Sequence, residues 1–520
     1  MSSRHSQVHR GMSNSIAPAH EARFGRLFSP HVAPPASFGA SDQEQSDNLA
    51  ALAERMVAGF DAPKDGPDGE ESGIPSLYTY FGQFVDHDLT FDASADGQKQ
   101  RDPGATIDFR SPAFDLDNIY GRGPGDQPYL YDEDGKSLLM GDAITQGTPR
   151  GRHSPGARDL QRNGAGRALI GDPRNDENAI VSQLQGLFIQ YHNRLVAEHQ
   201  HLGFDAIQAM VRAHYQHVVL EDFLPRIVKA EVLATLKGAD GKYDPAKLKF
   251  YDLSATPYMP IEFAAAAYRF GHSMVRPGYR LNDSVLLPIF PLPASVAPGF
   301  PEGLTGFRRL ISDWSLDWGR FIDIDVRDFG VDEPTSDAER ASNFRRLQLA
   351  YRIDTSLVDP LRNLPAAVAG DPPPSLAERN LKRGLQFGLP SGQAVAAAMG
   401  LTPLADALIG IGKALDAFGP DDPAPTPIAD IKAVFAGNCP LWAYCLAEAM
   451  QPPLAAAPAP VNPNQTINTA QLGPVGGGIV AEVFVGLMAA DPLSILNGGA
   501  HLRPRGDFKL KDLVTFALGL

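Results

Sequence analysis

Apolar residues recur at the period of an α-helix along much of this chain, and this spacing constrains the fold more than any other feature. Between residues 180 and 195 they fall on one stripe of an expected helix, as Ile180, Leu184, Leu187, Phe188, Tyr191 and Leu195. The segments 207–224 and 479–488 repeat the pattern. Such spacing predicts amphipathic helices, whereas the alternation typical of strands is scarce. We therefore predict a mainly α fold, a single large helical domain with long loops and little β structure.

The first 45 residues differ in composition from the rest of the chain. Residues 1–45 are rich in Ser, His, Ala and Pro and carry little periodic apolar pattern. This predicts a flexible or surface-wrapping N-terminal arm. Proline-rich stretches near Pro373, from Gly419 and from Gln451 indicate surface loops between helices. The apolar blocks between these loops are too closely interleaved for separate domains, so residues 60–520 are expected to form one domain.

Charge and cysteine content exclude several classes of protein. The net charge is -15, which argues against a nucleic-acid partner because such surfaces concentrate Lys and Arg. The two cysteines, Cys439 and Cys445, cannot form a disulfide framework and are interpreted as core thiols. No stretch reaches the roughly 18 apolar residues of a membrane span, and the N-terminus lacks a secretory signal. We expect a soluble, cytoplasmic protein, while secretion by a route without a signal peptide stays open.

One apolar segment, "YTYFGQFVDHDLTFD" from Tyr78, carries polar residues at helical spacing. Gln83 and His87 are four residues apart and Asp86 follows Gln83 by three, so a helix presents all three on nearly one face. Burying them costs free energy unless a ligand, a metal or water satisfies them. A single buried histidine is usually a hydrogen-bonded core residue, but the three together indicate a binding site.

The same segment resembles a known family, because "GQFVDHDL" matches the distal-helix signature of animal-type haem peroxidases, of the peroxidase-cyclooxygenase superfamily. Further blocks resemble that family in the same order: "RSPAFDLDNIYG" from Arg110, "GDPRNDE" from Gly171, "YRFGHSMVRP" from Tyr268, "RNLKRGLQFGLPS" from Arg379 and, more weakly, "LGPVGGGIVAEVFVGL" from Leu472. The resemblance runs from about residue 72 to about residue 500. It implies a haem peroxidase domain over residues 60–520, similar to bacterial members that lack disulfides.

The resemblance implies a role for each residue near the iron. His87 would be the distal acid–base group, with Gln83 beside it, and Arg174 would stabilise charge on the leaving oxygen of hydrogen peroxide. His272 would be the proximal ligand of the haem iron. Asn380 would accept a hydrogen bond from the second nitrogen of His272.

Three more residues would contact the haem itself. Arg383 resembles the arginine that pairs with a haem propionate, although a solvated helix charge explains it equally well. Asp86 and Glu177 stand where the family forms ester bonds to the haem, so the cofactor is either haem b or an ester-linked derivative. Asn178 replaces the methionine of the sulfonium-linked members, and no third link is expected.

The resemblance also implies a calcium ion. Its oxygen ligands would be those of a short loop together with one residue of the distal helix: Ser111, Ala113 through its carbonyl, Asp115, Asp117 and Asp88. Asp117 replaces the more usual serine, and the third carboxylate should strengthen attraction for a divalent cation. An acidic turn without an ion is the simpler alternative.

The implied function is a peroxidase that reduces hydrogen peroxide and oxidises a small donor, such as a halide, thiocyanate or a phenol, through a ferryl intermediate. One alternative is a fatty-acid dioxygenase of the same superfamily. Those enzymes carry a tyrosine three residues before the axial histidine, where this chain has Arg269, with Tyr268 one step earlier. A non-enzymatic haem-containing adhesion module is a second alternative. A third, a non-haem metal site, would draw on a group of histidines that lacks accompanying carboxylates: His192, His199, His201, His214 and His217.

Overall fold

The computed structural model describes residues 24–91, 110–292, 303–414, 424–459 and 462–520. Its helices are α1 (Asp42–Arg55), α2 (Leu77–Leu89), α3 (Asp117–Tyr120), α4 (Ala179–Glu198), α5 (Phe204–Val218), α6 (Leu224–Ile227), α7 (Ala230–Ala234), α8 (Ile261–Ala264), α9 (Asp337–Arg345), α10 (Leu376–Gln386), α11 (Gly392–Ala398), α12 (Ile428–Ile431), α13 (Leu441–Ala449), α14 (Gly476–Ala490) and α15 (Leu510–Leu518). The predicted mainly α fold is therefore confirmed.

The strands are short and form two-stranded sheets within the described ranges. They are β1 (Phe24–Gly25) with β3 (Met259–Pro260), β2 (Glu71–Pro75) with β6 (Leu349–Tyr351), β4 (Gly278–Arg280) with β5 (Leu286–Pro288), β7 (Gly410–Ile411) with β8 (Thr426–Pro427), and β9 (Ala455–Ala459) with β10 (Asn462–Thr469). The pair β1 and β3 is parallel, and the other four pairs are antiparallel.

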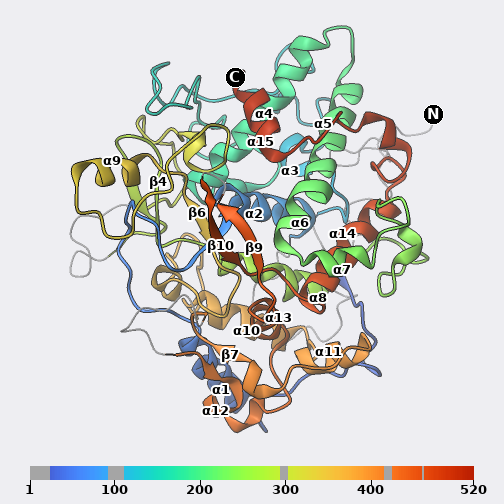
Figure 1. Cartoon of the computed structure of the whole chain (residues 1–520). Helices are drawn as coiled ribbons and strands as arrows, with labels where there is room; N and C mark the ends of the chain where they lie inside the picture. The colour runs from blue at the N-terminus through green and yellow to red at the C-terminus, as the bar shows by residue number, and fades with distance from the viewer. Residues whose placement is uncertain (1–23, 92–109, 293–302, 415–423, 460–461) are drawn as a thin grey trace.

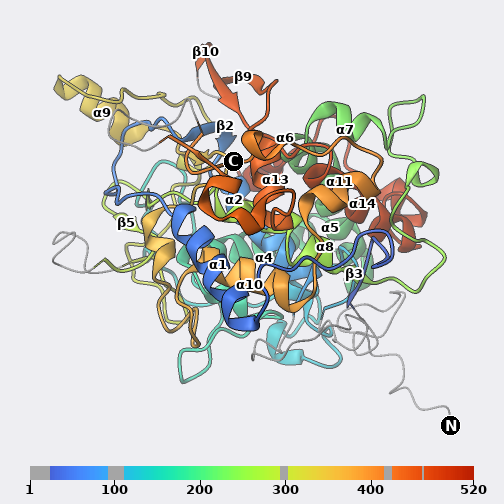
Figure 2. The same ribbon diagram turned by 90° about the horizontal axis from the view of Figure 1, so that it is seen from below.

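Helix α2 lies near the centre of the molecule in both orientations, with α4 and α5 beside it (Figures 1 and 2). Its aromatic face packs against α4, where the rings of Phe84 and Phe188 stack with centroids 4.6 Å apart. The ring of Tyr215, on α5, contacts Phe84 and Phe81 edge to face, with centroids 6.2 Å and 6.1 Å away. Aromatic contacts of this kind bury large areas, so the core holds α2 firmly along one side.

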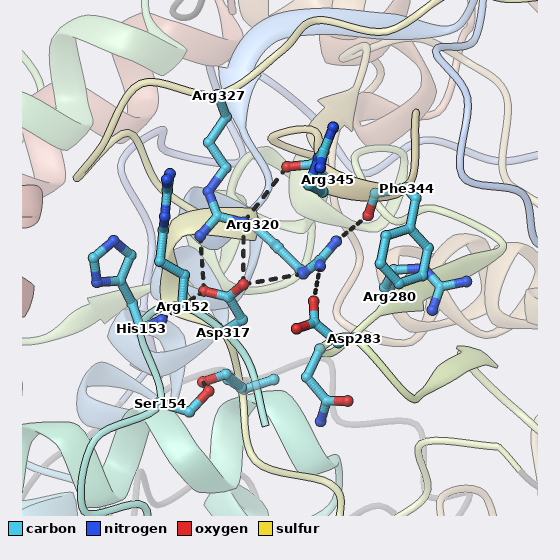
Figure 3. A network of polar contacts seen from close by, with 12 residues as sticks. Arg152, His153, Ser154, Arg280, Asp283, Asp317, Arg320, Arg327, Phe344 and Arg345 are labelled. Atoms are coloured by element: carbon cyan, nitrogen blue, oxygen red, sulfur yellow. Dashed lines mark hydrogen bonds and ion pairs between the residues drawn. The ribbon is translucent and has the colours of Figure 1, made fainter. Parts of the chain in front are cut away.

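The start of α2 is held by a segment that carries a buried ion network. The amide of Leu77 donates to the carbonyl of Phe321 at 2.9 Å. Close by, Asp317 forms ion pairs with Arg327 at 2.9 Å and with Arg320 at 3.2 Å (Figure 3). Arg320 also forms an ion pair with Asp283. Separating these charges would leave one of them buried without a partner, which costs free energy. The network therefore holds in place the segment that contacts the N-terminus of α2.

The helix predicted over residues 207–224 is interrupted. It runs as α5 to Val218, widens into a π turn over Val219–Phe223, and resumes as α6. Pro225 stands in the first turn of α6 and has no N–H to donate into an α-helical ladder. A π turn accommodates this local break. The other two predicted stripes lie within α4 and α14.

Residues 24–41 lie against the body of the protein. Phe24 and Phe28 are buried in the main core. Arg26 donates to the carbonyls of Phe387 and Gly388 at 2.8 and 3.1 Å. Residues 1–23 lie outside the described residues, and the division into an arm and one domain stays a prediction. Both cysteines are free and buried, as interpreted from the sequence. No helix in the described ranges has both the length and the apolar character of a membrane span.

Candidate active site

A cavity of about 300 Å³ lies where α2, the loop before α4 and the segment before β4 meet. Six of the residues singled out in the sequence line it together: Gln83, Asp86, His87, Arg174, Glu177 and His272. They come from segments separated by up to 189 positions in the chain, so the tertiary structure brings them together. The remainder of the wall is largely apolar and includes Ile289, Phe290, Leu361 and Leu364.

His87 lies on α2, one turn after Phe84, and lines the cavity. It is buried, and its Nδ1 lies 2.6 Å from Oδ1 of Asn175. Burial, followed by the nearby positive charge of Arg174, lowers the pKa of His87 to about 4. The imidazole is therefore neutral near pH 7 and can accept a proton. Asn175 is a site residue that sequence reasoning missed, since an asparagine next to Arg174 carries no local signal of this contact.

Arg174 is positioned by the carboxylate of Asp172. Asp172 accepts from the backbone N–H of Arg174 at 2.8 Å and from its Nη2 at 2.7 Å. Nη2 also reaches the carbonyls of His87 and Thr90. Burial alone would raise the pKa of Asp172, but the guanidinium groups of Arg174 and Arg110 hold it well below its usual range. The cation thus stands beside His87 with its orientation fixed by several acceptors.

Two carboxyl groups line the cavity on the same side. The Glu177 carboxylate accepts from Nε2 of Gln83, and burial raises the pKa of Glu177 to about 7. Thr90 donates its hydroxyl to Asp86 at 3.1 Å. The neighbouring Asp176 forms an ion pair with Arg162 at 2.7 Å. Asp86 and Glu177 therefore both face the cavity with part of their hydrogen-bonding capacity unused.

His272 ends the 3₁₀ helix Ala267–His272 and also lines the cavity. Nδ2 of Asn380, on α10, lies 2.7 Å from its Nδ1, and a half-turn of the amide places the accepting Oδ1 at the same point. Burial, followed by the charge of Arg269, lowers the pKa of His272 to about 3. A neutral imidazole with one nitrogen engaged by an amide has the other available to a metal.

Arg383 is not among the residues that line the cavity. Its guanidinium lies 5.3 Å from the ring of Phe387. The cavity is instead lined by Arg379, which precedes Asn380 on α10, and by Arg269. The pairing of Arg383 with a haem propionate stays a prediction, and Arg379 is a second cation on α10 that sequence reasoning did not single out.

A cluster of three buried carboxylates lies on the far side of α2. Oxygens of Asp88, Asp115 and Asp117 all lie within 4.8 Å of one another. Neither oxygen of Asp88 makes a hydrogen bond of normal geometry to a described residue. Ser111 donates to Asp115 at 2.6 Å, and Ala113 is buried in the same loop. Burial, followed by the charge of Asp117, raises the pKa of Asp115 to about 8. This donor set suits a hard divalent cation.

Two of the histidines considered for a non-haem metal site, His192 and His214, have hydrogen-bond partners in the protein. His192 contacts the hydroxyl of Tyr120 at 3.0 Å and the carbonyl of Lys136 at 2.8 Å. His214 contacts the hydroxyl of Tyr191 at 2.5 Å. In the described ranges no group of three potential ligands includes any of these histidines, and the packing supports a structural role for His192 and His214.

Comparison with known proteins gives concordant results. Residues 93–289 match the family model described as animal haem peroxidase. Human thyroid peroxidase is 27% identical over 234 residues, which are 43% of this chain and 21% of that protein. The mouse peroxidasin homolog is 26% identical over 231 residues, 43% of this chain and 13% of that protein. The matches thus span about a fifth or less of these relatives.

Two solved structures share the fold. Peroxidase A from Dictyostelium discoideum has a TM-score of 0.60 at 15% identity, covering 98% of this chain and 96% of that one. The fatty acid alpha-dioxygenase of Oryza sativa has a TM-score of 0.53 at 16% identity, covering 98% and 86%.

Proposed function

Because this chain belongs to the animal haem peroxidase superfamily, we propose that it is a peroxidase, which reduces hydrogen peroxide and oxidises a small electron donor. One observation carries the proposal. The residues suited to activate peroxide, His87 and Arg174, line the same cavity as His272, the residue suited to bind iron. An oxidoreductase with this arrangement has both an acid–base group and a fixed cation beside the place where peroxide would react.

The described residues fit a haem group. His272 would bind the haem iron, with Asn380 hydrogen-bonded to its other ring nitrogen. Asp86 and Glu177 would be the carboxylates able to form ester bonds to the haem, and Arg379 and Arg269 would supply positive charge to its propionates. When bound, haem supplies the electrons that reduce hydrogen peroxide to water.

His87 and Arg174 divide the work on the peroxide itself. The neutral imidazole takes the proton from one oxygen and returns it to the other, which leaves as water. Arg174 stabilises the negative charge that develops on the leaving oxygen, and its bonds to Asp172 keep it oriented without reorganisation. Gln83, held by Glu177, orients the incoming molecule beside His87.

We also propose a calcium ion at the carboxylate cluster, held by Asp88, Asp115 and Asp117 with oxygens of Ser111 and Ala113. The oxygens of Asp88, which make no hydrogen bond of normal geometry to a described residue, support this assignment, because buried charges are normally paired or bound to a metal. Asp88 follows His87 directly, so a cation there would brace the helix that presents the distal histidine.

A fatty-acid dioxygenase is the second candidate, and one observation favours it. Tyr268 lines the cavity although it stands four residues before His272, and its hydroxyl donates to the carbonyl of Gly82 at 3.2 Å. If bound haem that has reacted with peroxide took one electron and the phenolic proton left, the tyrosyl radical in that position would be able to abstract hydrogen from a bound lipid. Oxygen uptake with a fatty acid that Tyr268→Phe abolishes would select this function, whereas unchanged peroxide-dependent oxidation in the same variant would select the peroxidase.

The decisive experiment begins with the haem. Purified protein supplied with haem should show a Soret band and should oxidise phenols or halides when hydrogen peroxide is added. His272→Ala should lose the haem, and the matched control His192→Ala should keep it, since His192 lies in the core away from the cavity. Haem binding without any turnover would favour the adhesion module instead.

Two further variants test the roles of the cavity residues. Arg174→Lys keeps the charge but loses the planar fork, and the reaction with hydrogen peroxide should slow by about two orders of magnitude. After treatment with peroxide, haem should resist acid-organic extraction in the wild type and be released only from the double variant of Asp86→Val and Glu177→Gln. Complete extraction from the wild type would refute the ester bonds alone.

A further inference from the structure

Behind His87 runs a chain of polar side chains that the peroxidase chemistry above does not use. Oδ1 of Asn175 lies 2.6 Å from Nδ1 of His87. Nδ2 of Asn175 donates to Oε1 of Gln185 at 2.8 Å, and Nε2 of Gln185 donates to the backbone carbonyl of Asn118 at 3.0 Å. Asn175, Gln185 and Asn118 have no exposed surface, so water cannot substitute for any member of this chain.

The direction of these hydrogen bonds is determined by the last member. A backbone carbonyl can only accept, and the carbonyl of Asn118 also accepts from the amide of Gly171 at 3.0 Å. Gln185 must therefore present Nε2 to it and Oε1 to Asn175. Asn175 in turn must present Nδ2 to Gln185 and Oδ1 to His87. Turning both amides round would place two oxygens 3.0 Å apart in a dry interior, which is costly.

We infer that Asn175 is a positioning residue that holds the single proton of the neutral His87 ring on Nδ1 and leaves Nε2 free to accept a proton. The catalytic importance of this tautomer rests on the proposed function. The position of the proton on Nδ1 follows from the hydrogen bonds alone. A general base with its proton on the wrong nitrogen cannot act. The chain Asn175, Gln185 and Asn118 thus selects the tautomer that peroxide activation requires.

The tautomer can be measured directly in haem-free protein whose histidine rings carry ¹⁵N. Couplings between ring protons and nitrogens distinguish Nδ1–H from Nε2–H, and the signals that disappear in His87→Gln identify this residue among the 13 histidines. The wild type should show His87 with its proton on Nδ1. Asn175→Leu, similar in size but unable to accept, should shift the proton to Nε2 or produce a mixture. Asn175→Asp should restore Nδ1–H, since one carboxylate oxygen accepts it, while its other oxygen faces Oε1 of Gln185 and should lower the stability of the fold.

A second pair of variants keeps the test informative if Asn175→Leu does not fold. Gln185→Leu frees the amide of Asn175 to turn and should give a mixture of tautomers. Gln183→Leu is the matched control on the same helix, because Gln183 bonds to Trp314 and Leu316 and not to this chain. Unchanged Nδ1–H in folded Asn175→Leu or Gln185→Leu would overturn the inference.

Peroxide kinetics then connect the tautomer to function. With haem bound, Asn175→Leu should react with hydrogen peroxide about a hundredfold more slowly, at the lower end of what proton transfer contributes, and Asn175→Asp should recover most of the rate. If the protein proved to have no peroxidase activity, the tautomer measurement would stand unaltered, so failure of the proposed function and failure of this inference are distinguishable.

Discussion

The substitution Asp172→Asn tests how much the buried anchor of Arg174 stabilises the protein. Asp172 is fully buried and lies 2.7 Å from Arg174 and 3.1 Å from Arg110. Asparagine keeps the shape but removes the negative charge between two guanidinium groups. Breaking a buried pair costs about 3 to 5 kcal/mol. Water can reach Arg174, which is 24% exposed, and Arg110 still has Asp117 at 2.8 Å. The free energy of unfolding should therefore fall by about 3 kcal/mol, the lower end of this range.

The measurement is the free energy of unfolding, from urea denaturation followed by circular dichroism. The matched control is Asp142→Asn, since Asp142 pairs with Arg309 at 2.8 Å while the two side chains are 84% and 58% exposed. A pair so exposed contributes less than about 1 kcal/mol. The two ion pairs have nearly equal lengths and differ in burial, so equal losses for the two variants would refute the reasoning that burial sets the magnitude.

Three further predictions address other parts of the molecule. Burial raises the pKa of Glu448 from 4.5 to about 7, so the folded state holds its proton longer than the unfolded state. Stability should therefore fall by about 3 kcal/mol as pH rises between these values, and Glu448→Gln should remove that part of the pH dependence measured by denaturation. A calcium chelator should lower the melting temperature of the wild type but not of Asp88→Asn, and equal melting with and without chelator in the wild type would contradict a bound ion. Burial raises the pKa of Cys439 and of Cys445 well above the usual value, so neither should react with a thiol reagent until the protein is denatured, and rapid labelling of native protein would count against this packing.

Local patterns in the sequence predicted the elements well where the determining contacts lie within a few turns. The stripe from residue 180 to residue 195 lies in α4, and Gln83, Asp86 and His87 meet on one face of α2. Spacing of three and four residues decides which side chains share a helical face, and that relation does not depend on the rest of the fold. The resemblance to the haem peroxidases likewise needed only short blocks and their order.

The partners of the site residues were decided by the tertiary structure. Asn175 reaches His87 across 88 positions and Asn380 reaches His272 across 108. The choice of Asp172 as the anchor of Arg174, and of Arg379 as the α10 arginine at the cavity, depends on how the loops pack against α2. Helical periodicity records only which face of an element is buried, whereas contacts between distant segments depend on how those faces are assembled. The sequence alone therefore determined the elements and named the candidate residues, and the packing of those elements decided which charges and hydrogen bonds surround them.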